Sequence, residues 1–126
     1  MLPLQKQAIA LKAKLYRGFA DPSRLSILEA LRGGPLTVTA IVEQTGLSRT
    51  NVSNHLRCLS DCDLLTSETR GRYTWYQLSH PKLNDLLTLT EEILRDIAQD
   101  ISACANYTEE QTLFIEEGTD GESCNP

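Results

Sequence analysis

The sequence has few aromatic residues, few histidines and no long apolar run. Aromatic residues make up 6% of the 126 residues, and histidine occurs only twice. No apolar stretch approaches the ~20 residues that a membrane-spanning helix needs. The first residues also lack the basic cluster and apolar run of a secretory signal. We therefore expect a cytoplasmic protein that does not enter a membrane and keeps its four cysteines as thiols.

The residue combinations of a catalytic site are missing as well. No nucleophile with a neighbouring base, no glycine-rich phosphate loop and no carboxylate pair of catalytic spacing stands out. The two histidines, His55 and His80, lie in separate predicted elements. We therefore do not expect an enzyme.

The formal net charge of −5 is unevenly distributed along the chain. Residues 1–79 contain ten Lys and Arg against six Asp and Glu, a balance of +4. Residues 80–126 contain two basic residues against eleven acidic ones, a balance of −9. The acidic pI therefore does not exclude nucleic-acid binding, because the basic part is where a DNA-binding pattern lies.

Two helices are predicted at the start of the chain. Residues 4–19 are rich in good helix formers, with apolar residues near helical spacing. The pair Asp21-Pro22 starts the next helix, because an aspartate can cap exposed N–H groups and proline is tolerated at the first helical position. This helix ends at Gly33-Gly34-Pro35.

Two further helices form a helix-turn-helix pattern. Thr37 caps the first of them, which ends at Thr45-Gly46. Ser48 caps the second, which continues to Cys62. The short glycine-containing turn between the two helices is typical of a helix-turn-helix.

The rest of the chain predicts a hairpin, a long helix and an acidic tail. Residues 64–68 and 73–78 are β-prone and flank the turn residues 69–72. Ser79-His80-Pro81 opens a last helix whose apolar residues spread around much of its circumference, which indicates a subunit interface. We therefore expect an α+β, mostly helical fold in the order ααααββα. The predicted division is a domain over residues 1–104 and an acidic tail over residues 105–126.

The helix after Ser48 has an apolar face and a polar face. Val52, Leu56 and Leu59 recur at helical spacing, so their face packs on the core. The opposite face carries short hydrogen-bonding side chains and an arginine, which suit base edges and phosphates in a major groove. The arginines at the hairpin tip suit flanking phosphates or a minor groove. A polar face can simply be solvated, but the succession of turn, helix and basic hairpin favours DNA binding. The residues predicted to contact DNA are Ser48, Arg49, Thr50, Asn51, Ser53, Asn54, Arg57, Arg70 and Arg72.

Cys58 and Cys62 lie four residues apart at the end of the same helix. Their Cβ atoms are expected ~5–6 Å apart, close enough for two thiolates to bind one soft ion. Two ligands do not make a stable site, and Cys104 or Cys124 can supply a third. Two alternatives stay open, because cysteines also serve as small core hydrophobes and because Cys104 can form a redox-sensitive disulfide with Cys58 or Cys62.

Three segments resemble the ArsR/SmtB family of metal-responsive winged-helix repressors. Residues 47–59 resemble the recognition helix of that family, residues 19–28 the start of its second helix and residues 71–76 its wing. The resemblance covers about residues 8–104. It implies a winged helix-turn-helix homodimer, formed through the first and last helices, that represses a double-stranded DNA operator until an inducer binds.

The resemblance also implies where the inducer binds. The third-helix thiol motif of the family's arsenic and cadmium sensors is missing, because Leu36-Thr37-Val38-Thr39-Ala40 stands there. The histidine-containing zinc pattern of the last helix is missing too. The CmtR-type cadmium and lead sensors match, with two recognition-helix cysteines and one cysteine after the last helix. This match implies Cys58, Cys62 and Cys104 as metal ligands and gives Cys124 no counterpart.

A set of three thiolates suits Cd(II), Pb(II) or As(III). Zn(II) usually takes four ligands and would need Cys124, His55 or a water molecule in addition. We expect His55 to lie near DNA or at the edge of the core instead. Two other functions stay open: a repressor whose same cysteines respond to As(III) or to oxidation, and a thiol-based metal-buffering or interaction protein that does not bind DNA.

Overall fold

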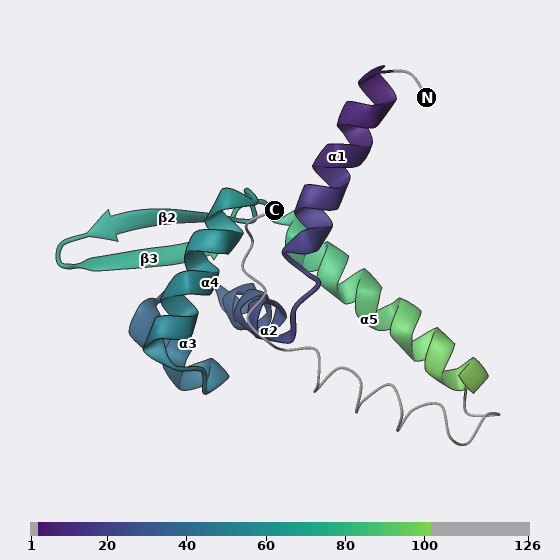
Figure 1. Cartoon of the computed structure of the whole chain (residues 1–126). Coiled ribbons are helices and arrows are strands. Elements are labelled where there is room, and N and C mark those ends of the chain that lie inside the picture. The colour runs from purple at the N-terminus through teal and green to yellow at the C-terminus, as the bar shows by residue number, and fades with distance from the viewer. Residues whose placement is uncertain (1–2, 102–126) are drawn as a thin grey trace.

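The structure is a computed structural model that describes residues 3–101 (Figure 1). The predicted helices and hairpin are confirmed, and two short elements are added, the 3-10 helix η1 and the strand β1. The boundary predicted at residue 104, the acidic tail, Cys104 and Cys124 all lie outside the described residues. The elements in chain order are α1 (Pro3–Arg17), α2 (Pro22–Ala30), η1 (Leu31–Gly33), β1 (Leu36–Thr37), α3 (Val38–Thr45), α4 (Arg49–Asp61), β2 (Leu65–Arg70), β3 (Tyr73–Leu78) and α5 (Lys82–Ile101).

The starts of the three middle helices are capped as the sequence predicts. The side chains of Asp21, Thr37 and Ser48 accept hydrogen bonds from backbone N–H groups in the first turns of α2, α3 and α4. Gly46 ends α3 with a φ of 75°, a left-handed conformation that glycine adopts without strain. These local signals place α3 and α4 next to each other with a short turn between them.

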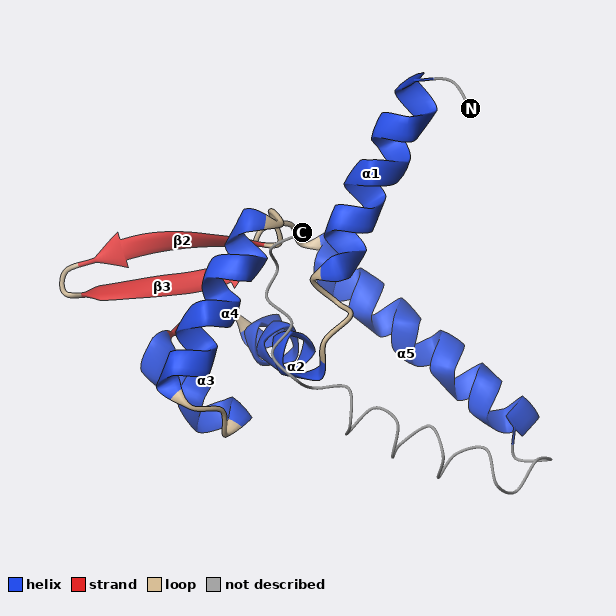
Figure 2. Cartoon of the chain, in the orientation of Figure 1, coloured by secondary structure: helices blue, strands red, loops and turns tan. Residues whose placement is uncertain are grey.

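The three strands form one antiparallel sheet in the order β1-β3-β2, and Figure 2 shows β2 and β3 side by side. β2 and β3 make the predicted hairpin, in which Arg70 pairs with Tyr73. The turn is tighter than predicted, because Arg70 belongs to β2 and only Gly71 and Arg72 connect the strands. Gly71 has a φ of 64°, which such a tight turn requires. The hairpin therefore projects as the wing of a winged helix-turn-helix fold.

The core of the described part of the chain lies between α2, α3, α4 and the base of the hairpin. Val52, Leu56 and Leu59, the predicted apolar face of α4, are at most 2% exposed. Leu83 and Leu87 attach the first turns of α5 to the same core. The remaining buried apolar residues of this core are Ile27, Leu28, Leu31, Ile41, Cys62, Leu64 and Leu65.

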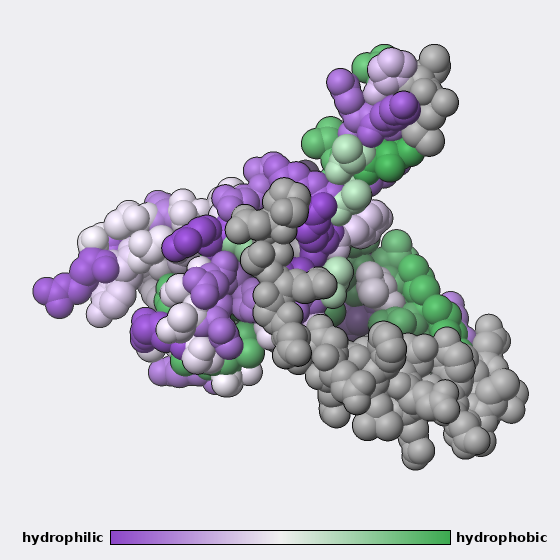
Figure 3. Space-filling view, viewed as in Figure 1, coloured by the Kyte–Doolittle hydropathy of each residue, from purple (hydrophilic) through white to green (hydrophobic). Residues whose placement is uncertain are grey.

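Two helices extend away from this core and leave apolar residues uncovered. No residue of α1 is buried, and Leu4, Ile9 and Leu11 are exposed. The outer part of α5 exposes further large apolar side chains, and Figure 3 shows hydrophobic residues gathered on both helices. Within the described residues, no helix is both long and apolar enough to cross a bilayer. The exposed apolar residues of α5 are Leu89, Ile93, Leu94 and Ile97.

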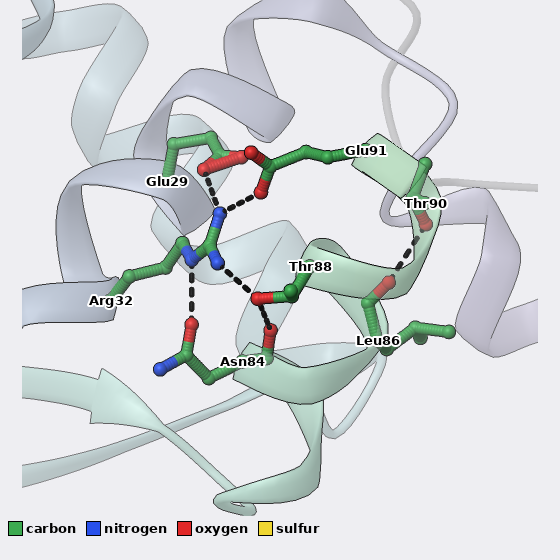
Figure 4. A network of polar contacts seen from close by, with 7 residues as sticks. All are labelled: Glu29, Arg32, Asn84, Leu86, Thr88, Thr90 and Glu91. Carbon is green, nitrogen blue, oxygen red and sulfur yellow. Dashed lines mark hydrogen bonds and ion pairs between the residues drawn. The ribbon is translucent and has the colours of Figure 1, made fainter. Parts of the chain in front are cut away.

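Arg32 ties the start of α5 to the helical core (Figure 4). Its Nε donates to Oδ1 of Asn84 at 2.6 Å, and its other guanidinium nitrogens donate to Thr88 and Glu91 of the same helix. Glu29 of α2 accepts from the same guanidinium at 2.9 Å. α5 is thus fixed to the core by its first turns, while its outer turns remain available.

Candidate nucleic-acid interface and metal centre

The polar face of α4 is exposed over its whole length. Every residue predicted to contact DNA is solvent-exposed, including the two arginines of the hairpin. A shallow polar hollow lies where α4 meets the hairpin, so the two predicted DNA-contacting elements are neighbours in space. Ser53, Arg57, Ser60, Ser67 and Tyr76 contribute to its lining.

Several of these basic side chains already have partners within the chain. Nη2 of Arg49 donates to Oγ1 of Thr39 at 2.9 Å, which joins the start of α4 to α3. Arg70 forms an ion pair with Glu68 at 3.1 Å and lies over the ring of Trp75, 5.8 Å from its centroid. Arg70 therefore sits on the side of the wing rather than in the turn.

Cys58 and Cys62 both lie in the interior. They are 7% and 6% exposed, and Cys62 belongs to the hydrophobic core cluster. α4 ends at Asp61, so Cys62 is its C-cap, yet the N–H of Cys62 still donates to the carbonyl oxygen of Cys58 at 3.1 Å. The helical i, i+4 relation between the two cysteines is therefore kept, and both are buried while the polar face of α4 is exposed.

The structure does not gather a complete metal site from the residues it describes. No group of three His, Cys, Asp or Glu side chains suited to a metal ion occurs between residues 3 and 101. The predicted third ligand, Cys104, lies outside this range. Cys58 and Cys62 are not joined by a disulfide, although Cys58 itself is disulfide-bonded. A metal ion could therefore bind to Cys58 only after reduction of this disulfide.

A buried arginine stands beside this cysteine pair. Arg24 of α2 is 1% exposed, and its Nη1 donates to Sγ of Cys58 at 3.9 Å. Sequence reasoning missed it, because an arginine near a helix start is usually solvent-exposed. One signal points to its burial: Arg24 shares the i, i+3, i+4, i+7 stripe of Ile27, Leu28 and Leu31.

His55 lies between the exposed and the buried parts of α4. Its side chain is partly buried, as expected for a residue at the edge of the core. Burial lowers the pKa of His55, and Arg24 acts in the same direction, whereas Asp21 opposes the change. The neutral imidazole is therefore favoured at this position.

Comparison with known proteins assigns the chain to a family. The model of the bacterial regulatory protein arsR family matches residues 21–67. The chain is also 40% identical over 85 residues to the HTH-type transcriptional regulator NmtR of Mycobacterium tuberculosis, covering 68% of this chain and 71% of NmtR. The chain belongs to the arsR family. Another relative, the HTH-type transcriptional regulator CmtR of the same species, is 41% identical over 83 residues, which cover 66% of this chain and 70% of CmtR.

Solved structures agree with the arsR-family fold. The homodimeric winged helix-turn-helix domain of Mb0332 from Mycobacterium bovis superimposes with a TM-score of 0.73. It covers 79% of this chain and 93% of its own, at 22% identity, so it supports the fold alone. The cadmium metal-sensor CmtR of Mycobacterium tuberculosis superimposes with a TM-score of 0.55 at 41% identity, covering 60% of this chain and 79% of CmtR.

Proposed function

We propose that this arsR-family chain is a homodimeric, metal-responsive transcriptional repressor. In the absence of metal it binds double-stranded operator DNA, and it releases the operator when Cd(II) or Pb(II) binds Cys58, Cys62 and Cys104. The observation that carries this proposal is the buried cysteine pair at the end of α4, a helix whose opposite face is exposed and polar.

The DNA half of the proposal rests on the exposed face of α4. Thr50, Ser53 and Asn54 offer short hydrogen-bonding groups from successive turns of a helix that is slim enough for a major groove. Arg57 and the basic tip of the wing supply charges for the flanking phosphates. The other predicted contacts, Ser48, Arg49, Asn51, Arg70 and Arg72, are exposed on the same two elements.

The homodimer rests on the uncovered apolar surface of α1 and α5. Contiguous exposed apolar residues on a soluble domain mark an interaction surface. Two-fold pairing through these helices would present two copies of α4 on one dimer, and successive major grooves require the two copies about one helical turn of DNA apart. A monomer would bind only one half-site of the operator. We therefore expect a substitution that prevents dimerisation to abolish operator binding as well.

The metal half rests on the chemistry of the donors. Two thiolates one helical turn apart bind soft ions, and Cys104 completes a three-thiolate set for Cd(II) or Pb(II). The cadmium sensor among the relatives supports a soft divalent ion. Zn(II) is less well served by three thiolates, because it usually takes four ligands.

The ion would act by tying the end of α4 to the segment that follows α5. Since α4 is one continuous helix from Arg49 to Asp61, a change at its buried end alters the angle of its exposed end. Operator affinity then falls, and by linkage the operator weakens metal binding by the same factor, typically about 1–3 kcal/mol of coupling.

The test compares the chain with two serine variants, Cys58→Ser and Cys124→Ser. Fluorescence anisotropy would follow a labelled operator while Cd(II) is added to the reduced protein, and ultraviolet thiolate-to-metal absorption would count the ligands. We expect Cys58→Ser to bind the operator normally without metal and to stay bound when Cd(II) is added. Cys124→Ser, the matched control, should respond like the unmodified chain.

Two results would overturn the assignment. Release of Cys58→Ser by Cd(II) at the normal concentration would remove Cys58 from the ligand set. Failure of the unmodified chain to bind its own promoter at low salt would favour the metal-buffering alternative.

A second candidate function uses the same cysteines as an oxidation sensor. The observation that favours it is the disulfide at Cys58. Peroxide without metal would then release the operator, and a reductant would restore binding. Cd(II) acting under fully reducing conditions would separate the metal sensor from this alternative.

A further inference from the structure

The interior of the domain holds a positive charge directly beside a proposed metal ligand. Arg24 is 1% exposed, and its guanidinium donates to Sγ of Cys58 at 3.9 Å and to the backbone oxygen of Arg17 at 2.9 Å. A guanidinium carries a full positive charge and is costly to desolvate when it is buried. Arg24 therefore adds a positive contribution to the potential at the sulfur, and the neighbouring buried carboxylate of Asp21 adds a negative one.

We propose that Arg24 makes the thiol site selective for the charge of the ion, favouring divalent Cd(II) and Pb(II) over trivalent As(III). The inference rests on the proposed function, since it requires Cys58 to be a ligand. Arg24 would act through the sulfur that binds the ion and would not touch the ion itself. It is thus a positioning and specificity residue.

The argument follows from charge counting. With any given number of thiolates, the complex of a divalent ion is one unit more negative than the complex of a trivalent ion. A nearby cation in a poorly solvated interior stabilises the more negative complex more strongly. In the structure the sulfur of Cys58 belongs to a disulfide. Once it is reduced and ligates an ion it is a thiolate, a stronger hydrogen-bond acceptor, so Arg24 can donate to it in the bound state as well. This preference does not depend on which residue supplies the third thiolate.

A purely structural role predicts something else. Arg24 also links α2 to the end of α1 through the carbonyl of Arg17, and its backbone N–H completes the cap of Asp21. The cap bond comes from the backbone and survives a substitution at Arg24. Loss of the side-chain bond to Arg17 alone would loosen the domain and weaken the binding of both kinds of ion by the same factor. The ratio of the Cd(II) and As(III) affinities separates the two roles.

The experiment compares Arg24→Met, which removes the charge and keeps an extended side chain, with Arg24→Lys, which keeps the charge. Competition titrations of the reduced full chain with Cd(II) and As(III), followed by thiolate-to-metal absorption, would give both affinities. We expect Arg24→Met to lower the Cd(II) affinity roughly 10- to 100-fold, the range typical of a lost partner of a metal ligand. The As(III) affinity should fall by a clearly smaller factor, so that the ratio of the two affinities changes. Arg24→Lys should stay near the original ratio.

Equal losses for both ions in Arg24→Met, or no loss for either, would overturn the inference. Circular dichroism melting would establish that each variant is folded, and Arg24→Gln replaces Arg24→Met if the latter does not fold. The Cys58→Ser variant keeps the two proposals apart. If it binds both ions normally, the proposed ligand set fails. If it loses both while the ratio in Arg24→Met is unchanged, only the role of Arg24 fails.

Discussion

The two halves of α4 are chemically opposite although they form one helix. From Arg49 to Asn54 only Val52 is buried, and the remaining side chains are polar and exposed. From His55 to Cys62 the helix and its C-cap bury Leu56, Leu59 and both cysteines. Most of the predicted DNA contacts on α4 lie in the first half and both candidate metal ligands at the end of the second, so one helix would connect the two proposed sites directly. If the two halves have these separate roles, substitutions in the second half should mainly affect stability and substitutions in the first half should mainly affect DNA binding.

The largest expected effect comes from a cavity in the buried half. Leu59→Ala should lower the free energy of unfolding by about 2–5 kcal/mol, because Leu59 is fully buried and its neighbours relax only partially into the space. Thr50→Ala in the exposed half should stay within about 0.5 kcal/mol. Urea denaturation of both variants is the measurement. Comparable losses would contradict the division.

The reverse test addresses DNA binding. Asn54→Ala should weaken operator binding by about 1–3 kcal/mol if the amide reads a base edge, and should leave the unfolding free energy nearly unchanged. The matched control is Gln77→Ala, an exposed amide of β3 outside the predicted DNA set. Anisotropy titrations at constant salt measure both variants. If Asn54→Ala loses no more operator affinity than Gln77→Ala, the polar face of α4 is only solvated.

Local sequence signals account for most of the fold. Caps such as Asp21 and Ser48 and the apolar period of α4 fix the helices within a few residues. β1 was missed, because Leu36 and Thr37 are too short to read as a strand and acquire that structure only by pairing with Tyr76 and Trp75. Such pairing joins segments about 40 residues apart and leaves no periodic trace in the sequence.

The candidate site was predictable only in part. The helical wheel separates the face of Asn54 from the cysteines, and the structure confirms that separation. The position of Arg24 beside Cys58 depends on how α2 crosses α4, which no local pattern encodes. The predicted third ligand, Cys104, lies outside the described residues, so its position stays a prediction. Contacts between residues of different elements, such as Arg24 and Cys58, therefore become visible only in the folded structure.

A smaller effect is expected at the start of the exposed half. Oγ of Ser48 accepts from the backbone N–H of Asn51 at 3.1 Å, so Ser48→Ala should cost about 1 kcal/mol of stability through a lost cap. Fraying of the first turn should also weaken operator binding. Ser48→Asp, which can still cap, should recover the stability. Thermal melting and operator titration distinguish the two contributions, and unchanged stability in Ser48→Ala would show that the cap is not used in solution.

The smallest effect is expected at His55, where the two halves meet. Burial lowers its pKa below the ordinary value of 6.5, so the folded chain binds the proton less readily than the unfolded chain does. The associated stability is fully present above pH 6.5 and is lost as the pH falls below that value. His55→Gln should remove part of the acid sensitivity between about pH 7.5 and 5.5, by less than the effect of the lost cap, because the side chain is only partly buried. Urea denaturation across this range would measure it, and the solvent-exposed His80→Gln is the control. An unchanged pH dependence in His55→Gln would show that His55 is solvated in the folded chain. The buried half of α4 would then begin after His55.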